Sequence, residues 1–296
     1  MSLHQRIAIS GASGLIGTAL VGHLKAEGHT VQRLVRRAPV AADEVQWDPQ
    51  TGFVDLEPLR GVDAVIHLAG VGVGDKRWSK KYKSEILNSR LLGTTAIANA
   101  VAELKPQVFI SASAIGWYGE SGNRAVVESD RVGDDFLAAV CREWESAADL
   151  AGDVRTVKLR TGLVLDPTGG ALGKMLPLFR LGLGGKLGNG KQWWSWITLH
   201  DVIRAISFLL ENKIEGPVNL TSPNPVTNQE FTSALARAMH RPALFPAPAI
   251  GLKIALGGFS SEILGSKKVM PQELTNAGFT WDYPHITNAL TALIEE

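Results

Sequence analysis

Cysteine is almost absent from this chain of 296 residues, and Cys141 alone cannot form a disulfide within it. A chain without disulfides is typical of a reducing compartment. A lone thiol could also act as a nucleophile, but no base stands near Cys141 in the sequence. We therefore expect Cys141 to be a small, buried hydrophobic side chain.

Net charge and long apolar runs are lacking as well. Thirty basic and 29 acidic residues leave a net charge of +1, so the composition gives no reason to expect nucleic acid or a membrane as partner. The most apolar late segment, residues 247–258, is broken by Pro248, Gly251 and Lys253, and no run reaches the length of a membrane span. Residues 1–6 are too short and polar for a signal peptide. We expect a cytoplasmic protein with a small-molecule substrate and no metal-ligand cluster.

The glycine-rich stretch at residues 7–17 joins a predicted strand to a predicted helix. The apolar run Ile7–Ile9 leads directly into Gly11, Gly14 and Gly17, after which apolar residues recur at helical spacing. In such a turn the first glycine permits a sharp bend, the second lets a pyrophosphate approach, and the third lets helix and strand pack closely. The helix N-terminus then faces the phosphate. The pattern indicates dinucleotide binding, with a tight turn that binds no ligand as the alternative.

The second predicted strand, residues 30–35, determines the expected choice of cofactor. A carboxylate at its end would bind the ribose hydroxyls of NAD and repel a 2′-phosphate. Here the strand carries Arg33 and ends in Arg36 and Arg37, with no carboxylate before Asp43. This arrangement favours NADP over NAD, although any one of these arginines could be a solvated surface charge.

The apolar run at residues 64–70 is typical of a strand buried on both faces. Its small-residue exit, Ala69-Gly70, would let a cofactor lie against the carboxyl end of the sheet. His67 lies within this run, and we interpret it as a packed, hydrogen-bonded core residue. The alternative is that its ring faces the ligand site.

Predicted strands and helices alternate along the chain, which indicates an α/β fold with a Rossmann-type, doubly wound parallel sheet. We assign residues 1–166 to an NADP-binding domain, to which residues 196–222 return. Residues 167–195 and 223–296 are assigned to a smaller, mostly helical substrate-binding lobe. After the first helix we expect a basic segment followed by a long helix within residues 78–104. Further helices are expected at residues 134–150, 200–210, 228–239, 250–256 and 286–294.

Residues 167–200 differ in composition from the rest of the chain. They are rich in glycine and contain no acidic residue, but they carry four basic residues and three tryptophans. A mobile cationic flap of this kind would suit an anionic or phosphorylated substrate. The alternative is a long loop whose aromatic rings pack on the core and whose charges are solvated. The residues concerned are Lys174, Arg180, Lys186, Lys191, Trp193, Trp194 and Trp196.

Several motifs together resemble the extended short-chain dehydrogenases/reductases of the NAD-dependent epimerase/dehydratase superfamily. They are SGASGLIG at 10–17, DAVIHLAG at 63–70, SRLLGT at 89–94, SASAIGWYG at 111–119, LRTGLVL at 159–165 and WITLHDVIRAI at 196–206. From about residue 245 onward, with VMPQELTNAGF at 269–279, the chain resembles the C-terminal extension of a branch called epimerase family proteins.

The resemblance implies a set of cofactor-binding residues. Those expected to hold the pyrophosphate are Gly11, Ser13, Gly14, Leu15 and Ile16. Those expected at the adenosine, its ribose and its phosphate are Arg36, Arg37, Leu68, Ala69 and Gly70. Arg90 stands where extended members carry an asparagine, and we expect it to contact cofactor phosphate or substrate instead.

The resemblance fails at the proton-transfer unit. The superfamily uses a serine, a tyrosine and a lysine four residues after that tyrosine, and the lysine lowers the pKa of the phenol toward the working pH. Ser113 matches the serine, but Phe136 and Val140 occupy the other two positions. Tyr118 is the nearest replacement phenol, with packing or hydrogen bonding within its loop as the alternative role. Glu143, Arg160 and His200 are further titratable groups near the matched motifs.

Three functions remain open on the sequence. The favoured one is an NADP(H)-dependent oxidoreductase or epimerase for a small, anionic or nucleotide-linked hydroxyl or carbonyl substrate, with Ser113 and Tyr118 as catalytic residues. The second is a non-catalytic NADP(H)-binding sensor or scaffold, and the third is a fold kept for a structural role without cofactor. A homodimer through residues 78–101 and 134–150 is also an expectation from the family.

Overall fold

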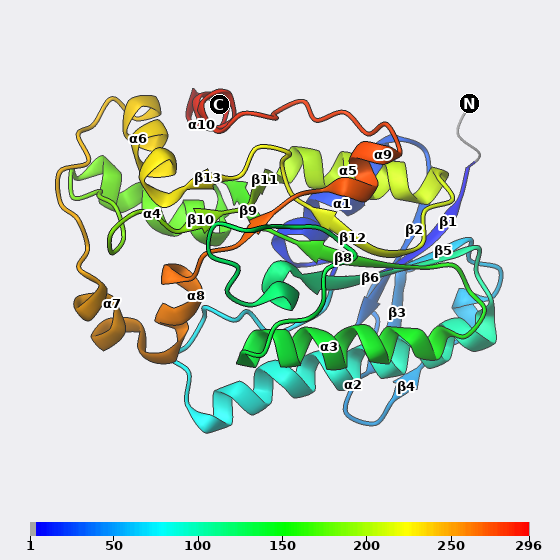
Figure 1. Cartoon of the computed structure of the whole chain (residues 1–296). Coiled ribbons are helices and arrows are strands. Elements are labelled where there is room, and N and C mark those ends of the chain that lie inside the picture. The colour runs from blue at the N-terminus through cyan, green and yellow to red at the C-terminus, as the bar shows by residue number, and fades with distance from the viewer. Residues whose placement is uncertain (1–3, 296) are drawn as a thin grey trace.

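The computed structural model describes residues 4–295, so part of the polar start at 1–6 lies outside the described residues. An eight-stranded sheet with the order β12-β8-β6-β5-β1-β2-β3-β4 forms the centre (Figure 1). Neighbouring strands are parallel except for β3 and β4, which are antiparallel. The strands are β1 (Arg6–Ser10), β2 (Thr30–Val35), β3 (Glu44–Asp48), β4 (Phe53–Val54), β5 (Ala64–His67), β6 (Val108–Ala114), β8 (Thr156–Thr161) and β12 (Gly216–Leu220).

The strand order reverses between β1 and β5. From β1 the chain proceeds to β2 and β3 on one side, and it then crosses to β5 on the other side of β1. In open α/β sheets, ligands bind outside the carboxyl ends of the strands at such a switch point. The predicted Rossmann-type fold is therefore confirmed, and it places the glycine turn at the position where a ligand is expected.

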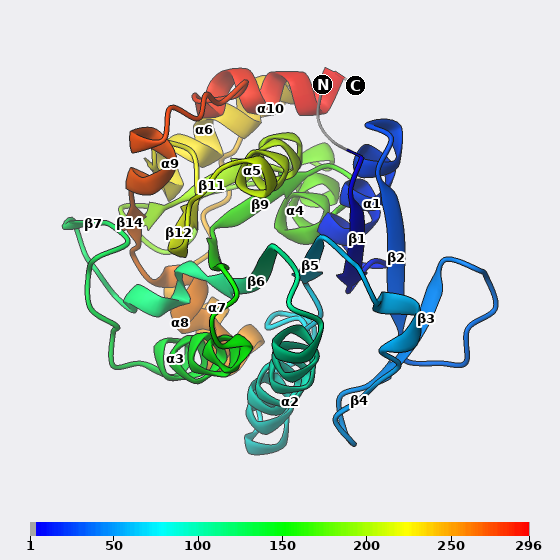
Figure 2. The same cartoon turned by 90° about the vertical axis from the view of Figure 1, so that its right-hand side faces the viewer.

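Helices cover both faces of the sheet (Figure 2). On one face Leu20 and Leu24 of α1 (Leu15–Ala26) share a core with Val202 and Ile206 of α5 (Leu199–Glu211). On the other face lie α2 (Lys80–Leu104) and α3 (Phe136–Ala148), which supply Val101 and Ala148 to a second core. The helices α3, α5, α6, α7 and α10 lie within two residues of their predicted bounds, and α2 ends at the predicted residue, because these segments carry an apolar stripe or clear end signals.

A smaller lobe of short elements lies beside the carboxyl ends of the strands (Figure 1). Its core contains Leu176, Phe231 and Leu290, together with Trp196. The division into domains at residues 166 and 195 stays a prediction. The elements outside the central sheet are β7 (Ala125–Val126), β9 (Leu163–Asp166), α4 (Gly170–Arg180), β10 (Trp193–Trp194), β11 (Trp196–Thr198), β13 (Val226–Thr227), α6 (Asn228–Ala238), α7 (Ala249–Leu256), α8 (Ser260–Leu264), β14 (Lys268–Val269), α9 (Gln272–Asn276), α10 (Ile286–Glu295) and four 3-10 turns, η1 (Glu57–Leu59), η2 (Ile115–Tyr118), η3 (Asp149–Ala151) and η4 (Gly257–Phe259).

Residues 167–200 are more ordered than a mobile flap. The helix α4 occupies the first part of the segment and buries Leu172, Leu176 and Phe179. Trp196 is fully buried, and the ring of Trp194 packs edge-on against Phe231. Trp194 and Trp196 therefore belong to the core of the lobe, as the alternative interpretation expects, whereas Trp193 lies beside the Lys268 ammonium group. The segment is not the long loop of that interpretation, because α4 occupies part of it. Among residues 4–295, no helix combines the length and the apolar composition needed to cross a bilayer.

The close packing of α1 on β1 yields a stability prediction. A Cβ atom added at Gly17 would lie far inside van der Waals contact of the Gly11 carbonyl oxygen, which is backbone and cannot give way. Gly22 lies in the same helix with nothing within 4 Å of the added atom. We expect Gly17→Ala to lower the free energy of unfolding by about 1–3 kcal/mol. We expect Gly22→Ala to raise it by about 0.5–1 kcal/mol. Urea unfolding measures both, and equal effects would contradict this account of the turn.

Candidate functional site

The turn after β1 brings two strand ends into backbone contact. Gly11 has a φ of +72°, in the left-handed region that favours glycine. A Cβ at Gly11 would lie 2.7 Å from the backbone of both Leu68 and Ala69, which follow β5. The absence of a side chain thus lets the loops after β1 and β5 approach closely. The residues predicted to hold the pyrophosphate are thus brought beside those predicted to line the adenosine side.

Among the described residues, no side chain accepts a hydrogen bond from the first backbone amides of α1. Gly14 is the N-cap residue, and no side chain caps the helix. Ser13 and Gly14 are exposed, whereas Leu15 and Ile16 are half-buried. A Cβ at Gly14 would meet only the Gly11 carbonyl oxygen, at 3.3 Å, so the remaining space is open. Free amides and the positive end of the helix dipole fit a pyrophosphate at this position.

Two of the three arginines around the end of β2 are already paired. Arg33 donates to Asp43 at 2.7 and 3.1 Å, and Arg37 donates to both carboxylate oxygens of Glu44 at 2.6 and 2.7 Å. The hydrogen bond from Arg37 is the main cause that lowers the pKa of Glu44 to about 2. These carboxylates lie at the start of β3, which pairs with β2, so a search along the sequence for an acid at the end of β2 misses them. Arg36 is exposed and makes no ion pair among the described residues, so its guanidinium is available for a phosphate.

Arg90 supports the loop after β5. Its Nη1 donates to the carbonyl oxygens of Val71 at 2.9 Å and Ile86 at 3.1 Å. The guanidinium lies 4.7 Å from the centre of the Trp144 ring, and burial lowers its pKa. A Cβ added at Gly70 would lie 3.7 Å from this group. Arg90 therefore adjoins the predicted adenosine side, but its contact with a cofactor phosphate or a substrate stays a prediction.

Two titratable side chains near the site are packed in the core. His67 is fully buried, its Nδ1 lies 2.6 Å from Ser10 Oγ, and burial lowers its pKa to about 3. Cys141 is also buried, and burial raises the pKa of its thiol to about 12. A neutral imidazole and a protonated thiol result, and neither faces the solvent. Both interpretations from the sequence, a packed histidine and a small hydrophobic cysteine, are confirmed.

Ser113 belongs to a buried charged network. Its Oγ donates to Glu145 Oε1 at 2.7 Å. Arg160 binds the same carboxylate with two nearly parallel hydrogen bonds, of 2.8 and 3.0 Å, and its guanidinium lies 3.9 Å from the centre of the Trp117 ring. Ser113, Glu145 and Arg160 are 4%, 4% and 2% exposed. The network joins β6, α3 and β8 in the interior of the protein.

Tyr118 extends this network toward β12. Its hydroxyl donates to Asn219 Oδ1 at 2.7 Å and accepts from Arg160 Nη1 at 3.0 Å. Sequence reasoning found no cation beside Tyr118, and the fold supplies one from 42 residues away. Burial nevertheless outweighs the guanidinium and raises the pKa of Tyr118 to about 12. Near neutral pH the phenol therefore keeps its proton and is a hydrogen-bond donor.

Glu145 was not identified as a site residue on the sequence, although its position in the predicted helix indicates burial. The apolar stripe of α3 contains Leu137, Val140, Cys141 and Trp144. Glu145, eight residues after Leu137, falls on the same stripe and is buried. A carboxylate at such a position requires a buried counter-ion, because an unpaired buried charge is too costly. Asn219 and Glu128 gave no comparable signal. By contrast, the side chain of Glu143 is 47% exposed and pairs with its neighbour Arg142.

A cavity of about 210 Å³ lies where α2, α3 and α8 approach one another. Phe136, which replaces the tyrosine of the superfamily, contributes to its wall, whereas Val140 packs with Tyr82 and Ile86 in the core. Lys267 is 5% exposed, and its Nζ lies 2.7 Å from Glu262 Oε2. The cavity thus combines aromatic walls with carboxylates and one ammonium group. Its lining residues are Trp78, Glu120, Asp135, Phe136, Leu137, Ser261, Glu262, Gly265 and Lys267.

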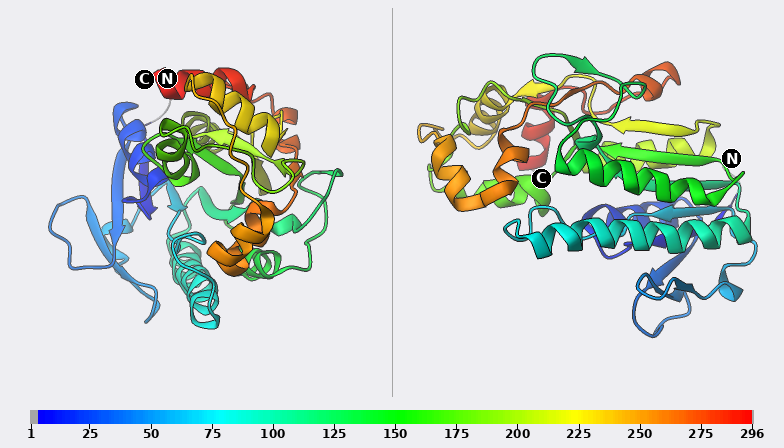
Figure 3. Two further views of the ribbon diagram at one scale, coloured as in Figure 1. Left: turned by 90° about the vertical axis from the view of Figure 1, so that its left-hand side faces the viewer. Right: turned by 60° about the horizontal axis from the view of Figure 1, so that its bottom comes forward.

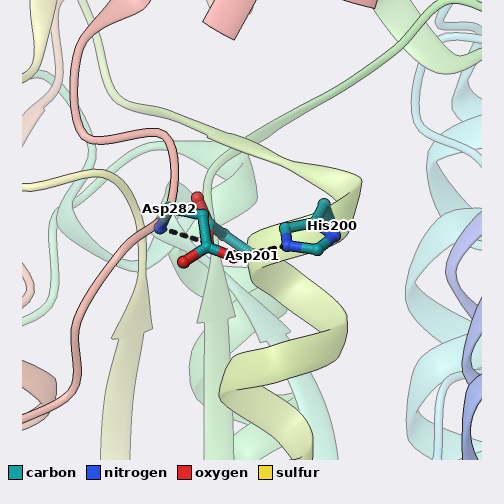
Figure 4. Close-up of side chains that lie close together, drawn as sticks. All are labelled: His200, Asp201 and Asp282. Atoms are coloured by element: carbon teal, nitrogen blue, oxygen red, sulfur yellow. Dashed lines mark hydrogen bonds and ion pairs between the residues drawn. The ribbon is translucent and has the colours of Figure 1, made fainter. Parts of the chain in front are cut away.

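His200, Asp201 and Asp282 form a second polar cluster, away from this cavity (Figure 4). Asp201 is fully buried, and its oxygens accept from the backbone amides of Asp282 and Tyr283, each at 3.0 Å. Arg204 Nη1 donates to the same carboxylate at 3.0 Å, and His200 Nε2 lies 2.7 Å from Asp282. Donors from the protein already occupy the Asp201 carboxylate. We therefore interpret this cluster as a structural contact that fixes the segment before α10 to α5, and not as a metal site.

The glycine turn, the uncapped helix and the switch point define the frame of a Rossmann-class protein for a dinucleotide of the NAD(P) type. Residues 7–221 match the model of the NAD dependent epimerase/dehydratase family, and residues 247–293 match a domain of unknown function. The chain belongs to the NAD dependent epimerase/dehydratase family.

The similar proteins extend over nearly the whole chain. An epimerase family protein of Mycobacterium leprae is 43% identical over 290 residues, which cover 96% of this chain and 94% of the relative. The crystal structure of human epimerase family protein SDR39U1 with NADPH is 32% identical and superimposes with a TM-score of 0.91, covering 98% and 99% of the two chains. UDP-N-acetylglucosamine 4-epimerase of Bacillus cereus, at 18% identity and a TM-score of 0.78, covers 98% of each chain and shares the fold.

The buried ion pair yields a prediction about stability. Replacing Glu145 by glutamine removes the charge that compensates Arg160, and we expect the free energy of unfolding to fall by about 3–5 kcal/mol. Glu143→Gln is the matched control, because Glu143 lies in the same helix with an exposed side chain. We expect that control to change stability by less than about 0.5 kcal/mol. Denaturant unfolding compares the two variants, and a Glu145→Gln protein as stable as the control would refute the role of the ion pair.

Proposed function

We propose that the protein binds NADP(H) along the carboxyl edge of its sheet. The observation that carries this proposal is the uncapped start of α1 at Gly14, with the unpaired guanidinium of Arg36 at the end of the neighbouring strand. Gly11, Ser13, Leu15 and Ile16 would hold the pyrophosphate together with Gly14. Leu68, Ala69 and Gly70 would line the adenosine side. Arg36 would meet the 2′-phosphate, with Arg37 beside it held by Glu44.

The proposed activity is that of an oxidoreductase or epimerase acting on a small hydroxyl or carbonyl substrate. A bound nicotinamide cofactor supplies hydride transfer, so the chain must exchange a proton at the substrate oxygen. The family match and the human relative that was crystallised with NADPH support this activity. The cavity walls of Trp78 and Phe136 offer aromatic faces, and its carboxylates accept hydrogen bonds from hydroxyl groups. A nucleotide-linked sugar would fit if its phosphates lie outside this acidic cavity.

Ser113 and Tyr118 are the proposed proton-transfer residues. With a pKa of about 12, Tyr118 is protonated near neutral pH and would act as an acid toward a substrate carbonyl. The Tyr118 hydroxyl, which donates its hydrogen bond to Asn219 Oδ1 in this structure, would donate to the substrate carbonyl instead and then transfer its proton to it. Arg160, 3.0 Å away, would stabilise the phenolate that remains. Ser113 Oγ would turn its proton from Glu145 to the same substrate oxygen and donate a hydrogen bond to it. A protonated phenol can thus supply the proton that the reduction of a carbonyl requires.

The choice of cofactor is tested by calorimetric titration with NADPH, NADP⁺, NADH and NAD⁺. We expect Arg36→Ala to weaken NADPH binding about 10- to 100-fold, because one charge-assisted hydrogen bond contributes about 1.5–3 kcal/mol. NADH lacks the 2′-phosphate, so its affinity should stay within about threefold. Arg60→Ala is the control, since Arg60 is exposed and precedes β5, at the amino ends of the strands and away from the proposed site. Equal losses for NADPH and NADH, or wild-type binding of NADH as tight as NADPH, would contradict the proposal.

The catalytic assignment is tested on phosphorylated and nucleotide-linked carbonyl substrates by following the oxidation of NADPH. We expect Ser113→Ala and Tyr118→Phe each to reduce turnover about 100-fold or more, as for the loss of a proton-transfer group. NADPH affinity should stay within about threefold of wild type, because neither side chain is expected to contact the pyrophosphate or the 2′-phosphate. Thermal unfolding controls for damage to the buried network. Unchanged turnover in both folded variants would remove these residues from the mechanism.

A non-catalytic sensor or scaffold is the second candidate, and one observation favours it. Phe136 and Val140 cannot transfer protons, and the replacement groups Ser113 and Tyr118 are both at most 4% exposed. A sensor must bind its partner differently in the two redox states, since only a difference in affinity can transmit that state. Pull-down with the NADP⁺-loaded and the NADPH-loaded protein tests this. A partner retained by one form only would support the sensor, and equal retention would exclude it.

A further inference from the structure

Two segments of the smaller lobe contain no acidic residue. Residues 167–200 and residues 231–261 carry seven lysines and arginines and no aspartate or glutamate, although the whole chain has a net charge of only +1. Such a distribution produces a strong local positive field, whatever the sum over the chain. The basic residues are Lys174, Arg180, Lys186, Lys191, Arg237, Arg241 and Lys253.

The two acid-free segments lie side by side. The amide of Phe245 donates to the carbonyl of Gly184 at 3.2 Å, and the amide of Ala247 donates to the carbonyl of Lys186 at 2.9 Å. Gly188 in turn donates to Ala247 at 2.9 Å. The left view of Figure 3 shows this end of the molecule, with α7 in orange at its surface. These hydrogen bonds bring the middle of one segment against the middle of the other. Lys174 is the exception among the seven basic residues, because its Nζ lies 3.8 Å from Asp75 Oδ1 outside both segments.

The same end exposes most of the large apolar side chains found at the surface. Among the described residues eleven large apolar side chains are exposed, and seven of them lie in these two segments. The helix α7 has no fully buried residue, and Ile250 and Ile254 on it are exposed. We call this surface the cationic apolar end. Its exposed apolar residues are Leu178, Leu181, Leu183, Leu244, Phe245, Ile250 and Ile254.

We propose that the cationic apolar end docks on an anionic lipid surface. Side chains such as Leu181 and Ile250, which are 73% and 74% exposed, would enter the boundary between headgroups and acyl chains. Lysines and arginines in the same two segments would face the negative headgroups. An apolar surface with cations of a single sign has the composition of interfacial membrane binders. Docking of this kind needs no membrane-spanning segment.

A second copy of the chain is a poorer occupant of this surface. A symmetric interface pairs the same surface with itself, so the cations of one copy would face those of the other. Like charges opposed across an interface cost binding energy. A lipid surface supplies the opposite charge and also buries the exposed apolar side chains.

Vesicle flotation of the full chain tests the proposal. We expect flotation with phosphatidylcholine vesicles that contain about one third phosphatidylserine and none with phosphatidylcholine alone, because the cations need anionic headgroups. The double variant Phe245→Ser with Ile250→Ser should reduce partitioning at least about tenfold. Val40→Ser with Phe53→Ser is the matched control, because these two exposed apolar residues lie outside both segments, and its partitioning should be unchanged.

The charges are tested separately with Arg180→Glu combined with Lys253→Glu, which changes two exposed side chains. We expect this variant to lose flotation at physiological salt while its thermal unfolding and NADPH titration stay as in wild type. Absence of wild-type flotation on anionic vesicles at low salt would overturn the proposal. Equal losses in the Val40/Phe53 control would do the same. A wild-type dimer that the Phe245/Ile250 variant converts to monomers in sedimentation, without vesicle binding, would assign the surface to a second copy instead.

Discussion

The ion pair between Arg160 and Glu145 is the interaction on which the interior of this protein depends most. Arg160 lies on β8 and Glu145 on α3, and both side chains are almost fully buried. Removal of two charges from water is costly, so the pair is stable only because further hydrogen bonds complete it. Ser113, Tyr118 and the carbonyl of Glu128 make those bonds. The same network thereby positions both residues that we propose for proton transfer.

The network also connects the sheet to the smaller lobe. Asn219 on β12 accepts from Tyr118, and its Nδ2 donates to the carbonyl of Met270. Glu128 accepts from the amides of Asn219, Gln272 and Glu273, and burial raises its pKa. Backbone amides of the C-terminal segment are therefore held by side chains beside the candidate active site. A substitution that destabilises this network would therefore also weaken the packing of the smaller lobe against the sheet.

The predictions from the sequence succeeded where a local pattern is sufficient. The glycine spacing in residues 7–17 specified a strand, a close turn and a helix start, and the apolar run around His67 specified a buried strand. Where the prediction was incomplete, distant residues were involved. The arginines at the end of β2 looked free in the sequence, yet the parallel pairing of β2 with β3 places Asp43 and Glu44 beside Arg33 and Arg37. The glycine-rich segment 167–195 looked mobile, yet α4 packs three of its side chains into the core of the lobe.

The sequence by itself determined the doubly wound fold and the cofactor frame, because these follow from glycines, strand runs and helix stripes that are close together in the chain. Its motifs also carried the resemblance to the family. Tertiary structure decided which charges are free. Only the fold shows that Arg36 is unpaired while Arg37 is bound, and that Tyr118 lies beside Arg160 but keeps a high pKa. It also brings residues 184–188 beside residues 245–247, so that two segments without acidic residues adjoin in a nearly neutral chain. Burial and charge pairing depend on distances in space, and spacing along the sequence does not contain them.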